Sequence, residues 1–391
     1  MTAPDDTFFF LLDHPALRHF NLLSDRKPYM TPRFVQEVYE DAKKQRFPSR
    51  DAAYQDWIDY GRMAGLEYAP QQNTLLKIVL KVKDEPELLQ RWLDYHAAIV
   101  GLSNLVIMDC GSTDAEHWRI LNRVKDDALI LSFPGWYDRL QVVDEYPQLY
   151  YWLTRNCRYL TAMDADEFLF GFDGETISPL HVNQVLRDAV EPIFAPTWIT
   201  NAARPALSES GIDWDKPIRF ALDQASLTEG LISGKSVIRS SDLLDMGYLG
   251  HNLHVGRVME RMTPGSFGQL FQFHISDLGP RIGRRRTAKH LAVRGVLPAG
   301  LTDETAIEAH LRAIQATSPE RWHIRYYVER YLDAVEPMPP PRGPTFETRL
   351  LTGVTETSPE FSAQVAAFDF VRVWRETPPH LYSVPTLSSA G

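Results

Sequence analysis

Two aspartates near the middle of the chain have a spacing that could hold a metal ion. Asp164 and Asp166 follow directly after the apolar residues 158–163. In an extended segment, side chains two positions apart point the same way, so both carboxylates could approach one cation or its bridging water. Oxygen ligands of this kind select Mg²⁺ or Mn²⁺, which usually keep open positions for phosphate oxygens. The spacing predicts a divalent cation and a phosphorylated substrate.

Two further acidic groups follow strand-like segments earlier in the chain. The tripeptide Lys-Asp-Glu at 83–85 follows residues 75–82, and a run with two aspartates at 109–114 ends a second apolar stretch. Carboxylates gathered at one edge of a sheet repel one another unless a cation or hydrogen-bond donors lie among them. A hard divalent cation is the simplest compensation, which strengthens the prediction of a metal site.

The segments before these acids alternate between strand-like and helical patterns. This alternation predicts right-handed crossovers and an α/β fold, with a mainly parallel sheet flanked by helices. Ligands bind beyond the carboxyl ends of the strands in such a sheet. Strands are predicted over 75–82, 104–109, 128–133 and 158–163, and helices over 86–100, 115–125 and 146–157.

Three regions are expected along the chain. Residues 1–72 show helical but no strand-like patterning, 73–300 form the α/β domain, and 301–391 are again helical. Within the α/β domain, short apolar pieces among Pro, Gly and His after residue 170 predict antiparallel additions and active-site loops. The C-terminal region has a proline-rich connector at 336–344 and a predicted last helix over 358–374.

The composition excludes several classes of protein. The 41 Lys and Arg against 51 Asp and Glu give a net charge of −10, which disfavours a nucleic-acid binder. The two cysteines, Cys110 and Cys157, are too few for a disulfide framework or a thiolate zinc site. The apolar runs are far shorter than the roughly 18 residues of a membrane span, and no basic segment precedes Phe8–Leu12. We therefore expect a cytoplasmic protein.

Residues 83–114 together with 163–169 resemble the GT-A glycosyltransferases, in the family-2-like branch related to glycosyltransferase family 92. Members carry Lys-Asn-Glu, a Trp and a His on the next helix, Asp-x-x-Ser-x-Asp, and Asp-x-Asp-Glu-Phe. The resemblance covers roughly residues 75 to 290. It implies a Rossmann-like GT-A fold with helical additions at both ends. It also implies a metal-dependent, hexosyltransferase-like enzyme that transfers the sugar with inversion.

The substrates implied are a nucleotide-diphosphate sugar, with UDP-sugars favoured, and a glycan or lipid-linked glycan acceptor in bacterial cell-surface polysaccharide synthesis. Glu85 and Asp109 would contact the uracil and ribose. Asp166 would ligate Mn²⁺ or Mg²⁺, and Asp164 would face the ribose or sugar and share the metal site. Lys83 and Asp114 also match the pattern and are assigned to the nucleotide-sugar site.

Three residues near the first motif need separate comment. Asp84 stands where the family has Asn, which keeps an oxygen acceptor but removes a donor. Trp92 and His96 match the family, yet they lie on the apolar face of the predicted helix. We expect those two to be core residues rather than ligands.

Later segments at 233–239, 250–255 and 271–289 resemble further blocks of the family. In related enzymes a late histidine completes the metal shell, and neutral imidazole suits Mn²⁺. His274 is the first candidate and His254 the second, followed by His251. Either of the last two could instead bind the donor sugar or the acceptor, and each of the three could be a buried structural histidine.

A basic cluster spans residues 281–289 in this otherwise acidic chain. Guanidinium groups there could stabilise the charge on the departing phosphate, and Arg281 and Arg284 are assigned to the donor site. The alternatives are a solvated loop or a peripheral contact with anionic lipid headgroups. The cluster comprises Arg281, Arg284, Arg285, Arg286 and Lys289.

An inverting transfer needs a base that accepts the proton of the acceptor hydroxyl. The candidates, in order, are Asp245, Glu229, Asp242 and Asp277. Two other functions stay open: a carbohydrate-binding scaffold with a transferase fold, and a phosphohydrolase of the haloacid dehalogenase type. The latter is disfavoured because Phe168 stands where that motif has Thr or Val, and because the motif follows the fourth predicted strand.

Overall fold

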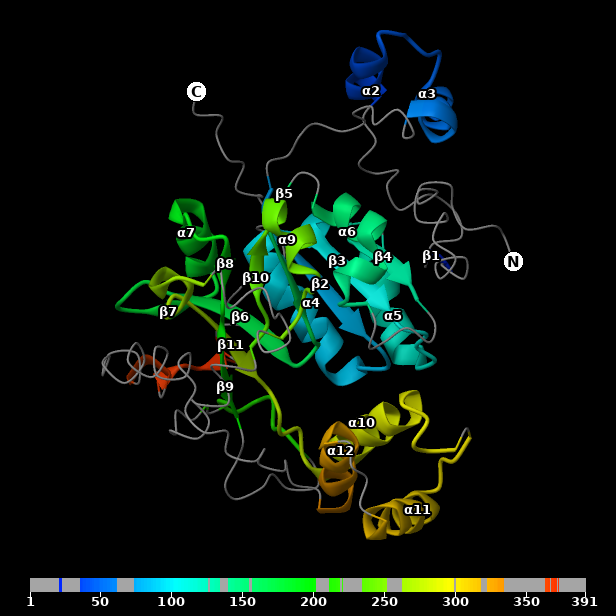
Figure 1. Cartoon of the computed structure of the whole chain (residues 1–391), viewed down its shortest axis with the longest axis vertical. Helices are drawn as coiled ribbons and strands as arrows, with labels where there is room; N and C mark the ends of the chain where they lie inside the picture. The colour runs from blue at the N-terminus through cyan, green and yellow to red at the C-terminus, as the bar shows by residue number, and fades with distance from the viewer. Residues whose placement is uncertain are drawn as a thin grey trace.

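The computed structural model describes most of the central part of the chain and short pieces of both ends (Figure 1). The described residues are 21–22, 36–61, 74–125, 127–133, 140–154, 157–201, 211–218, 220, 234–251, 262–298, 300–317, 322–333, 363–365, 367–370 and 372.

A seven-stranded sheet forms the centre of the molecule, in the order β1-β4-β3-β2-β5-β10-β8. The four strands β4, β3, β2 and β5 are parallel, which confirms the predicted mainly parallel α/β sheet. All nine residues of β2 are buried, as expected for a strand covered on both faces. The bounds are β1 Asn21–Leu22, β2 Thr74–Val82, β3 Leu105–Asp109, β4 Leu129–Ser132, β5 Cys157–Met163, β8 Ile193–Phe194 and β10 Val237–Arg239.

Helices flank this sheet, and their ends follow local sequence signals. The longest, α4, begins with Pro86 at its first position and is followed by Gly101. That glycine has φ 76° and ψ 149°, so the backbone is positive in φ as expected but extended rather than left-handed helical. The flanking helices are α4 Pro86–Val100, α5 Ala115–Val124, α6 Pro147–Thr154, α7 His181–Asp188 and α9 Ser240–Met246.

A second, four-stranded sheet has the order β7-β6-β11-β9. Its strands are β6 Glu167–Phe172, β7 Ile177–Ser178, β9 Thr197–Thr200 and β11 Leu270–His274. β6 is antiparallel to β7 and β11, whereas β9 is parallel to β11. This sheet accounts for the antiparallel additions expected after residue 170, with one parallel pair among them.

Three C-terminal helices, α10 Pro280–Val293, α11 Glu304–Ala316 and α12 Trp322–Asp333, share a small core. That core joins Leu291 and Leu297, from before the expected boundary at 300, to Ile307, Leu311, Val328 and Tyr331 after it. Figure 1 shows these helices below the central sheet. Of the predicted last helix, Val365, Phe368 and Phe370 are described and are buried in the main core. The connector at 336–344 lies outside the described residues.

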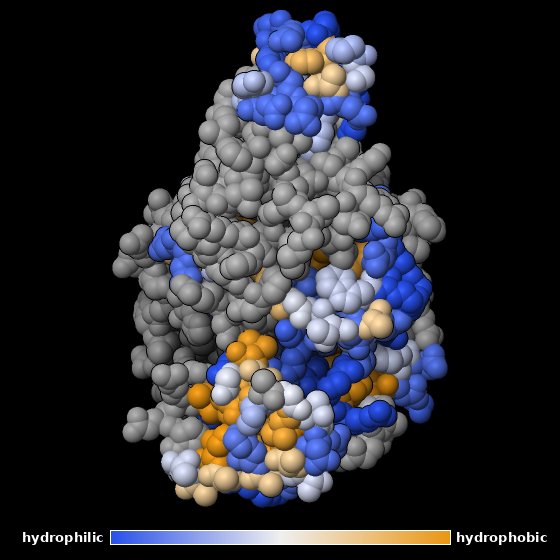
Figure 2. All heavy atoms as spheres, turned by 90° about the vertical axis from the view of Figure 1, so that its right-hand side faces the viewer, coloured by the Kyte–Doolittle hydropathy of each residue, from blue (hydrophilic) through white to orange (hydrophobic). Residues whose placement is uncertain are grey.

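The N-terminal helices α2 Gln36–Lys43 and α3 Arg50–Asp56 pack on each other around Tyr39 and Trp57. Figure 2 shows this pair at the top of the molecule with a largely hydrophilic surface on the visible side. The two-residue strand β1, antiparallel to β4, lies in a region where only helices were expected, because two residues are too few to show an alternating pattern. Within the described ranges, no helix combines the length and apolar character needed to cross a membrane.

Candidate functional site

Strand register brings the three acidic segments to one edge of the central sheet. Val82 pairs with Asp109 on the neighbouring strand, and Leu80 pairs with Met163 on the other side of β2. The residues that follow these positions therefore leave the sheet together. Around them lies a group of buried or half-buried charged side chains, which we call the charged cluster: Lys81, Glu85, Asp164, Asp166, Glu167, Lys235, His274, Arg286 and Lys289.

The Asp-x-Asp segment is a turn between β5 and β6, not the extended segment that the spacing suggested. The backbone N–H of Glu167 donates to the carbonyl of Asp164 over 3.1 Å, and the backbone N–H of Asp164 donates to the Glu167 carboxylate over 2.8 Å. The turn gives Asp164 and Asp166 different cationic partners. The two carboxylates are close to each other, but among the described residues no single Lys or Arg side chain pairs with both.

Lys235 compensates Asp164 and Glu167. Its Nζ lies 2.6 Å from Oδ2 of Asp164 and 3.0 and 3.1 Å from the two oxygens of Glu167, and its side chain is 0% exposed. The preceding residue has to be glycine, because a Cβ on Gly234 would lie 1.7 Å from the carbonyl oxygen of Pro196. The close approach of these two backbone segments places Lys235 next to the acidic turn.

Burial and neighbouring charges compete over the pKa values of these two acids. At Asp164 burial favours the neutral form, but Lys235 and Lys81 outweigh it and hold the pKa below its usual value. At Glu167 burial, together with the charges of Asp164 and Asp166, outweighs Lys235 and raises the pKa to about 7. The turn therefore combines an ionised aspartate with a glutamate that titrates near neutrality.

Arg286 of α10 bridges the other two acids. Its Nε lies 2.9 Å from a carboxylate oxygen of Glu85, and one terminal nitrogen lies 2.6 Å from Oδ2 of Asp166. Lys289, one helical turn later, also donates to Glu85. Burial opposes ionisation of both acids, but Arg286 with Lys289 lowers the pKa of Glu85, and Arg286 with His274 lowers that of Asp166.

The predicted metal ligands Asp166 and His274 are brought together. Nε2 of His274 lies 3.6 Å from Oδ2 of Asp166, and its ring stacks on Trp198 with a centroid distance of 4.2 Å. Oδ1 of Asp164 is buried and accepts no hydrogen bond from the described residues. These donors suit a divalent cation, although Arg286 holds Oδ2 of Asp166 in this conformation. In the described part of the chain, no group of three or more His, Cys, Asp or Glu is arranged as a metal site.

Asp109 is fully buried at the end of β3. Its carboxylate accepts from the backbone N–H groups of Gly111 and Ser112, and it lies 3.3 Å from Nε2 of His117. Nδ1 of His117 in turn accepts from the backbone N–H of Glu85. These contacts join the loops after β2 and β3 at the place where the resemblance expects the nucleoside.

The neighbouring residues Lys83, Asp84 and Asp114 fasten the same two loops. Lys83 donates to the carbonyls at 110 and 111, over 3.2 and 3.0 Å. Asp84, at φ 47°, accepts from the backbone N–H groups of residues 113 and 114 over 2.7 and 2.8 Å. Asp114 caps α5 by accepting from the backbone N–H of His117. The structure thus gives all three residues a role in loop conformation.

Trp92 and His96 are core residues, as expected. Both are fully buried, and their rings lie 4.2 Å apart between centroids. The ring of His96 contacts the carbonyl of Trp92 and accepts from the backbone N–H of Leu169 on β6. Burial lowers the pKa of His96 to about 3, so this histidine is neutral and joins α4 to β6.

Within the basic segment, the periodicity of α10 determines which basic side chains contact the acids. Arg286 and Lys289 are three positions apart and share one face of α10. Arg281 is exposed and Arg284 half-buried, and no ion pair of either with the charged cluster occurs among the described residues. Arg285 pairs with Glu87 at the surface. The cations assigned to the donor site from the sequence are therefore not the ones that reach Glu85 and Asp166.

Of the candidate bases that the structure describes, Asp242 and Asp245 lie away from the cluster and Asp277 lies on its side. β10 is antiparallel to β5 and ends at Arg239 opposite Tyr159, so α9, which carries Asp242 and Asp245, begins at the other edge of the sheet. Asp242 forms an ion pair with Arg239. Asp277 follows β11 three residues after His274, on the side of the cluster, and accepts from the backbone N–H of residue 279.

Two further candidates, Glu229 and His254, lie outside the described residues. His251 is described, and its ring lies 5.2 Å from that of Trp198, beside the cluster. Sequence reasoning did not single out Lys235, Lys81 or His117. Lys235 lies in the segment 233–239 that resembles a later block of the family, but nothing there marked the lysine as the partner of the acidic turn.

The low pKa values of Asp164, Asp166 and Glu85 predict loss of stability in acid. Their contribution is complete above the usual values of 3.8 and 4.5 and is lost as the pH falls through their lower folded-state values. Each such group adds a slope of up to about 1.4 kcal/mol per pH unit. Thermal unfolding of Asp166→Asn should therefore depend less steeply on pH than wild type below about pH 4. Equal slopes would contradict these assignments; Asp188→Asn, at an exposed position, is the control.

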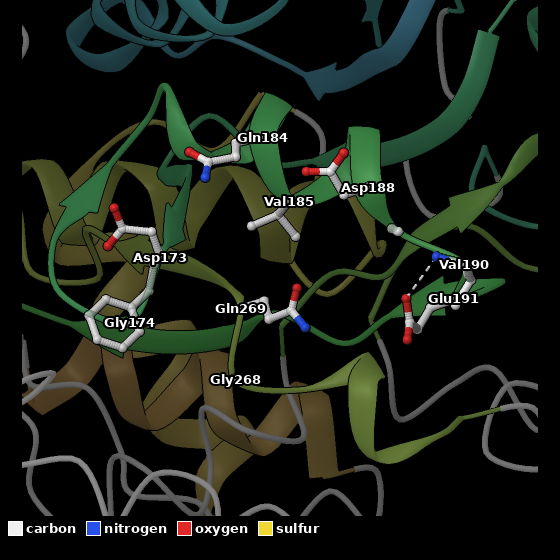
Figure 3. Close-up of a pocket in the computed structure, with 11 residues that line it drawn as sticks. Asp173, Gly174, Gln184, Val185, Asp188, Val190, Glu191, Gly268 and Gln269 are labelled. Carbon is white, nitrogen blue, oxygen red and sulfur yellow. Dashed lines mark hydrogen bonds between the residues drawn. The ribbon is translucent and has the colours of Figure 1, made fainter.

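A separate hollow of about 530 Å³ lies at the other end of β6 (Figure 3). Gln184, Val185 and Asp188 from α7 face it on one side and Gln269 on the other, as the close-up shows. None of the residues predicted to bind the donor or a metal lines this hollow. β6 separates it from the acidic turn by the length of the strand, because Glu167 is the first residue of β6.

Comparisons with known proteins add little to this description. No protein-family model and no curated protein matches the chain. A solved structure described as "Crystal Structure of a Mycobacterial Protein" is 14% identical, covers 58% of this chain and 77% of its own, and gives a TM-score of 0.31. A likeness this weak carries no argument about function.

Proposed function

We propose that this protein is a glycosyltransferase that uses a nucleotide-diphosphate sugar. The observation that supports this most is the meeting of Glu85, Asp109 and the Asp164–Asp166 turn at one sheet edge, with His274 beside Asp166. The parallel strand order β4-β3-β2-β5 next to antiparallel β10 agrees with the GT-A fold expected from the resemblance.

The residues of this edge suggest a division of roles. Glu85 and Asp109, on the loops after β2 and β3, would form the nucleoside side of the donor site. Asp166 and His274, with Asp164 next to them, would hold Mn²⁺ or Mg²⁺. When bound, such a cation supplies positive charge to the diphosphate.

The chain's own cations would act on the leaving group. Transfer of the sugar leaves negative charge on the departing diphosphate, and fixed guanidinium and ammonium groups stabilise that charge as it develops. Arg286 and Lys289 are the cations that lie against the acidic edge.

Asp277, on the side of the cluster, is our first candidate for the base that accepts the proton of the acceptor hydroxyl.

The acceptor is proposed from the resemblance alone. A glycan or lipid-linked glycan of the cell surface fits the family, with a cytoplasmic enzyme and peripheral contact at the membrane. No nucleic acid is proposed as a partner, because the net charge of −10 would repel its phosphates.

Calorimetric titration with UDP, GDP and CMP, each with and without Mn²⁺, tests this proposal. We expect one nucleotide to bind in a metal-dependent way and Asp166→Ala to lose that binding. If no nucleotide binds under any condition, the transferase proposal fails. Binding to a glycan array without nucleotide binding would instead favour the carbohydrate-binding scaffold, and turnover of phosphate esters would favour the phosphohydrolase.

A further inference from the structure

The positive charges that face the acidic edge come from the protein itself. Arg286 is only 9% exposed and contacts Glu85 and Asp166, both of which are buried. Lys289 lies against Glu85 and also donates to the carbonyl of Lys83 over 2.5 Å. The cluster therefore already contains counter-ions at the positions where a cation and a diphosphate would have to bind.

The charged cluster sets four acids against four Lys and Arg side chains. The four acids are Glu85, Asp164, Asp166 and Glu167, and the four cations are Lys81, Lys235, Arg286 and Lys289. Removing one partner from a buried ion pair leaves an uncompensated charge, which is strongly unfavourable. A cation that binds Asp166 alone must displace or repel Arg286. A diphosphate that binds Arg286 alone takes away the cationic partner of Asp166 and leaves Glu85 with Lys289 only.

A metal–diphosphate pair meets neither obstacle. The cation takes over the carboxylate of Asp166, the phosphate oxygens take over Arg286, and Lys289 keeps its ion pair with Glu85, so each buried charge keeps a partner of opposite sign. The exchange replaces one set of ion pairs with another.

The helix that carries the two cations is packed in a way that allows such an exchange. The C-terminal half of α10 belongs to the small core that it shares with α11 and α12, separate from the core of the central sheet. Among the described residues, the polar contacts of α10 with the acidic edge are the ion pairs of Arg286 and Lys289, a surface pair between Arg285 and Glu87, and the hydrogen bond from Lys289 to the carbonyl of Lys83. Ile282, near the start of the helix, packs on the main core.

We propose that Arg286 and Lys289 hold the acids of the donor site in ion pairs within the protein, and that a divalent cation and a nucleoside diphosphate open this site only when both bind. This inference rests on the proposed function. It predicts reciprocal coupling: Mn²⁺ strengthens UDP binding, and UDP strengthens Mn²⁺ binding by the same factor. We expect a factor of about ten or more in wild type, within the range of coupling energies common in proteins.

Arg286→Gln tests the proposal, with Lys289→Gln as a second variant if the first does not fold. Binding of Mn²⁺ alone is measured from the decrease of the EPR signal of the free ion. Mn²⁺ should bind Arg286→Gln about tenfold or more tightly than wild type, because Asp166 becomes available. UDP titrations with and without Mn²⁺ should show a smaller coupling factor in the variant. Arg285→Gln, on the same helix but at the surface, is the matched control and should keep the wild-type coupling.

The outcomes separate this inference from the proposed function. Independent binding of Mn²⁺ and UDP to wild type would overturn the inference and leave the transferase proposal intact. Equal Mn²⁺ affinity of wild type and Arg286→Gln would overturn the inference as well. If no nucleotide binds at all, the proposed function fails, while the titration with Mn²⁺ alone still tests whether the ion pairs of Arg286 hinder binding of the cation.

Discussion

Replacing Lys235 by Met should lower the free energy of unfolding by about 3–5 kcal/mol, the usual cost of removing one partner from a buried ion pair. Lys235 is fully buried and is the nearest cation to both Asp164 and Glu167. Without it, the buried Glu167 and the half-buried Asp164 lose their main compensating charge. Denaturant unfolding of the two proteins, monitored by circular dichroism, measures the difference.

Two further variants make this prediction specific. Lys216→Met removes an ion pair with Asp213 whose side chains are 78% and 50% exposed, and it should leave the free energy of unfolding nearly unchanged. Adding Glu167→Gln to Lys235→Met should restore part of the loss, because it removes one of the uncompensated charges. A loss below about 1 kcal/mol for Lys235→Met would show that the lysine is not the essential counter-ion.

Asp166→Asn should reduce sugar transfer by at least about a hundredfold, the effect typical of removing one preorganised electrostatic contact from an active site. The substitution keeps the size of the side chain but removes the charge that faces His274 and Arg286. Transfer should be measured with the nucleotide sugar whose nucleotide binds in the titration. Thermal unfolding at neutral pH should confirm that the variant is folded.

Asp188→Asn is the matched control for this activity measurement. Asp188 is exposed on α7 and lines the hollow at the far end of β6 (Figure 3), so its loss should leave transfer unchanged. If Asp188→Asn lowers transfer as much as Asp166→Asn does, the reaction belongs to the hollow rather than to the charged cluster.

The central sheet could be predicted from the sequence because its strands carry strong local patterns. Residues 75–82 form a nearly continuous apolar run, and Pro86 and Gly101 mark the ends of the following helix. The strands of the second sheet were not located individually. β7 has two residues and β9 four, lengths at which alternation gives no usable signal.

The acids of the candidate site could be predicted and most of their partners could not. Asp164 and Asp166 follow a strand, a position that can be recognised locally. Lys235 lies 71 positions from Asp164, and Arg286 lies 120 positions from Asp166, so only the folded chain brings them together. Choosing Arg286 over Arg284 in the basic segment also requires the helical phase of α10, which the sequence of the segment did not reveal.

The backbone conformation at Asp84 suits either Asp or Asn. Asp and Asn are the residues other than glycine that most readily adopt the left-handed conformation found there. Either one offers a side-chain oxygen to the two N–H groups that Asp84 binds on the next loop. Exchanging Asp84 for Asn should therefore preserve the conformation of both loops.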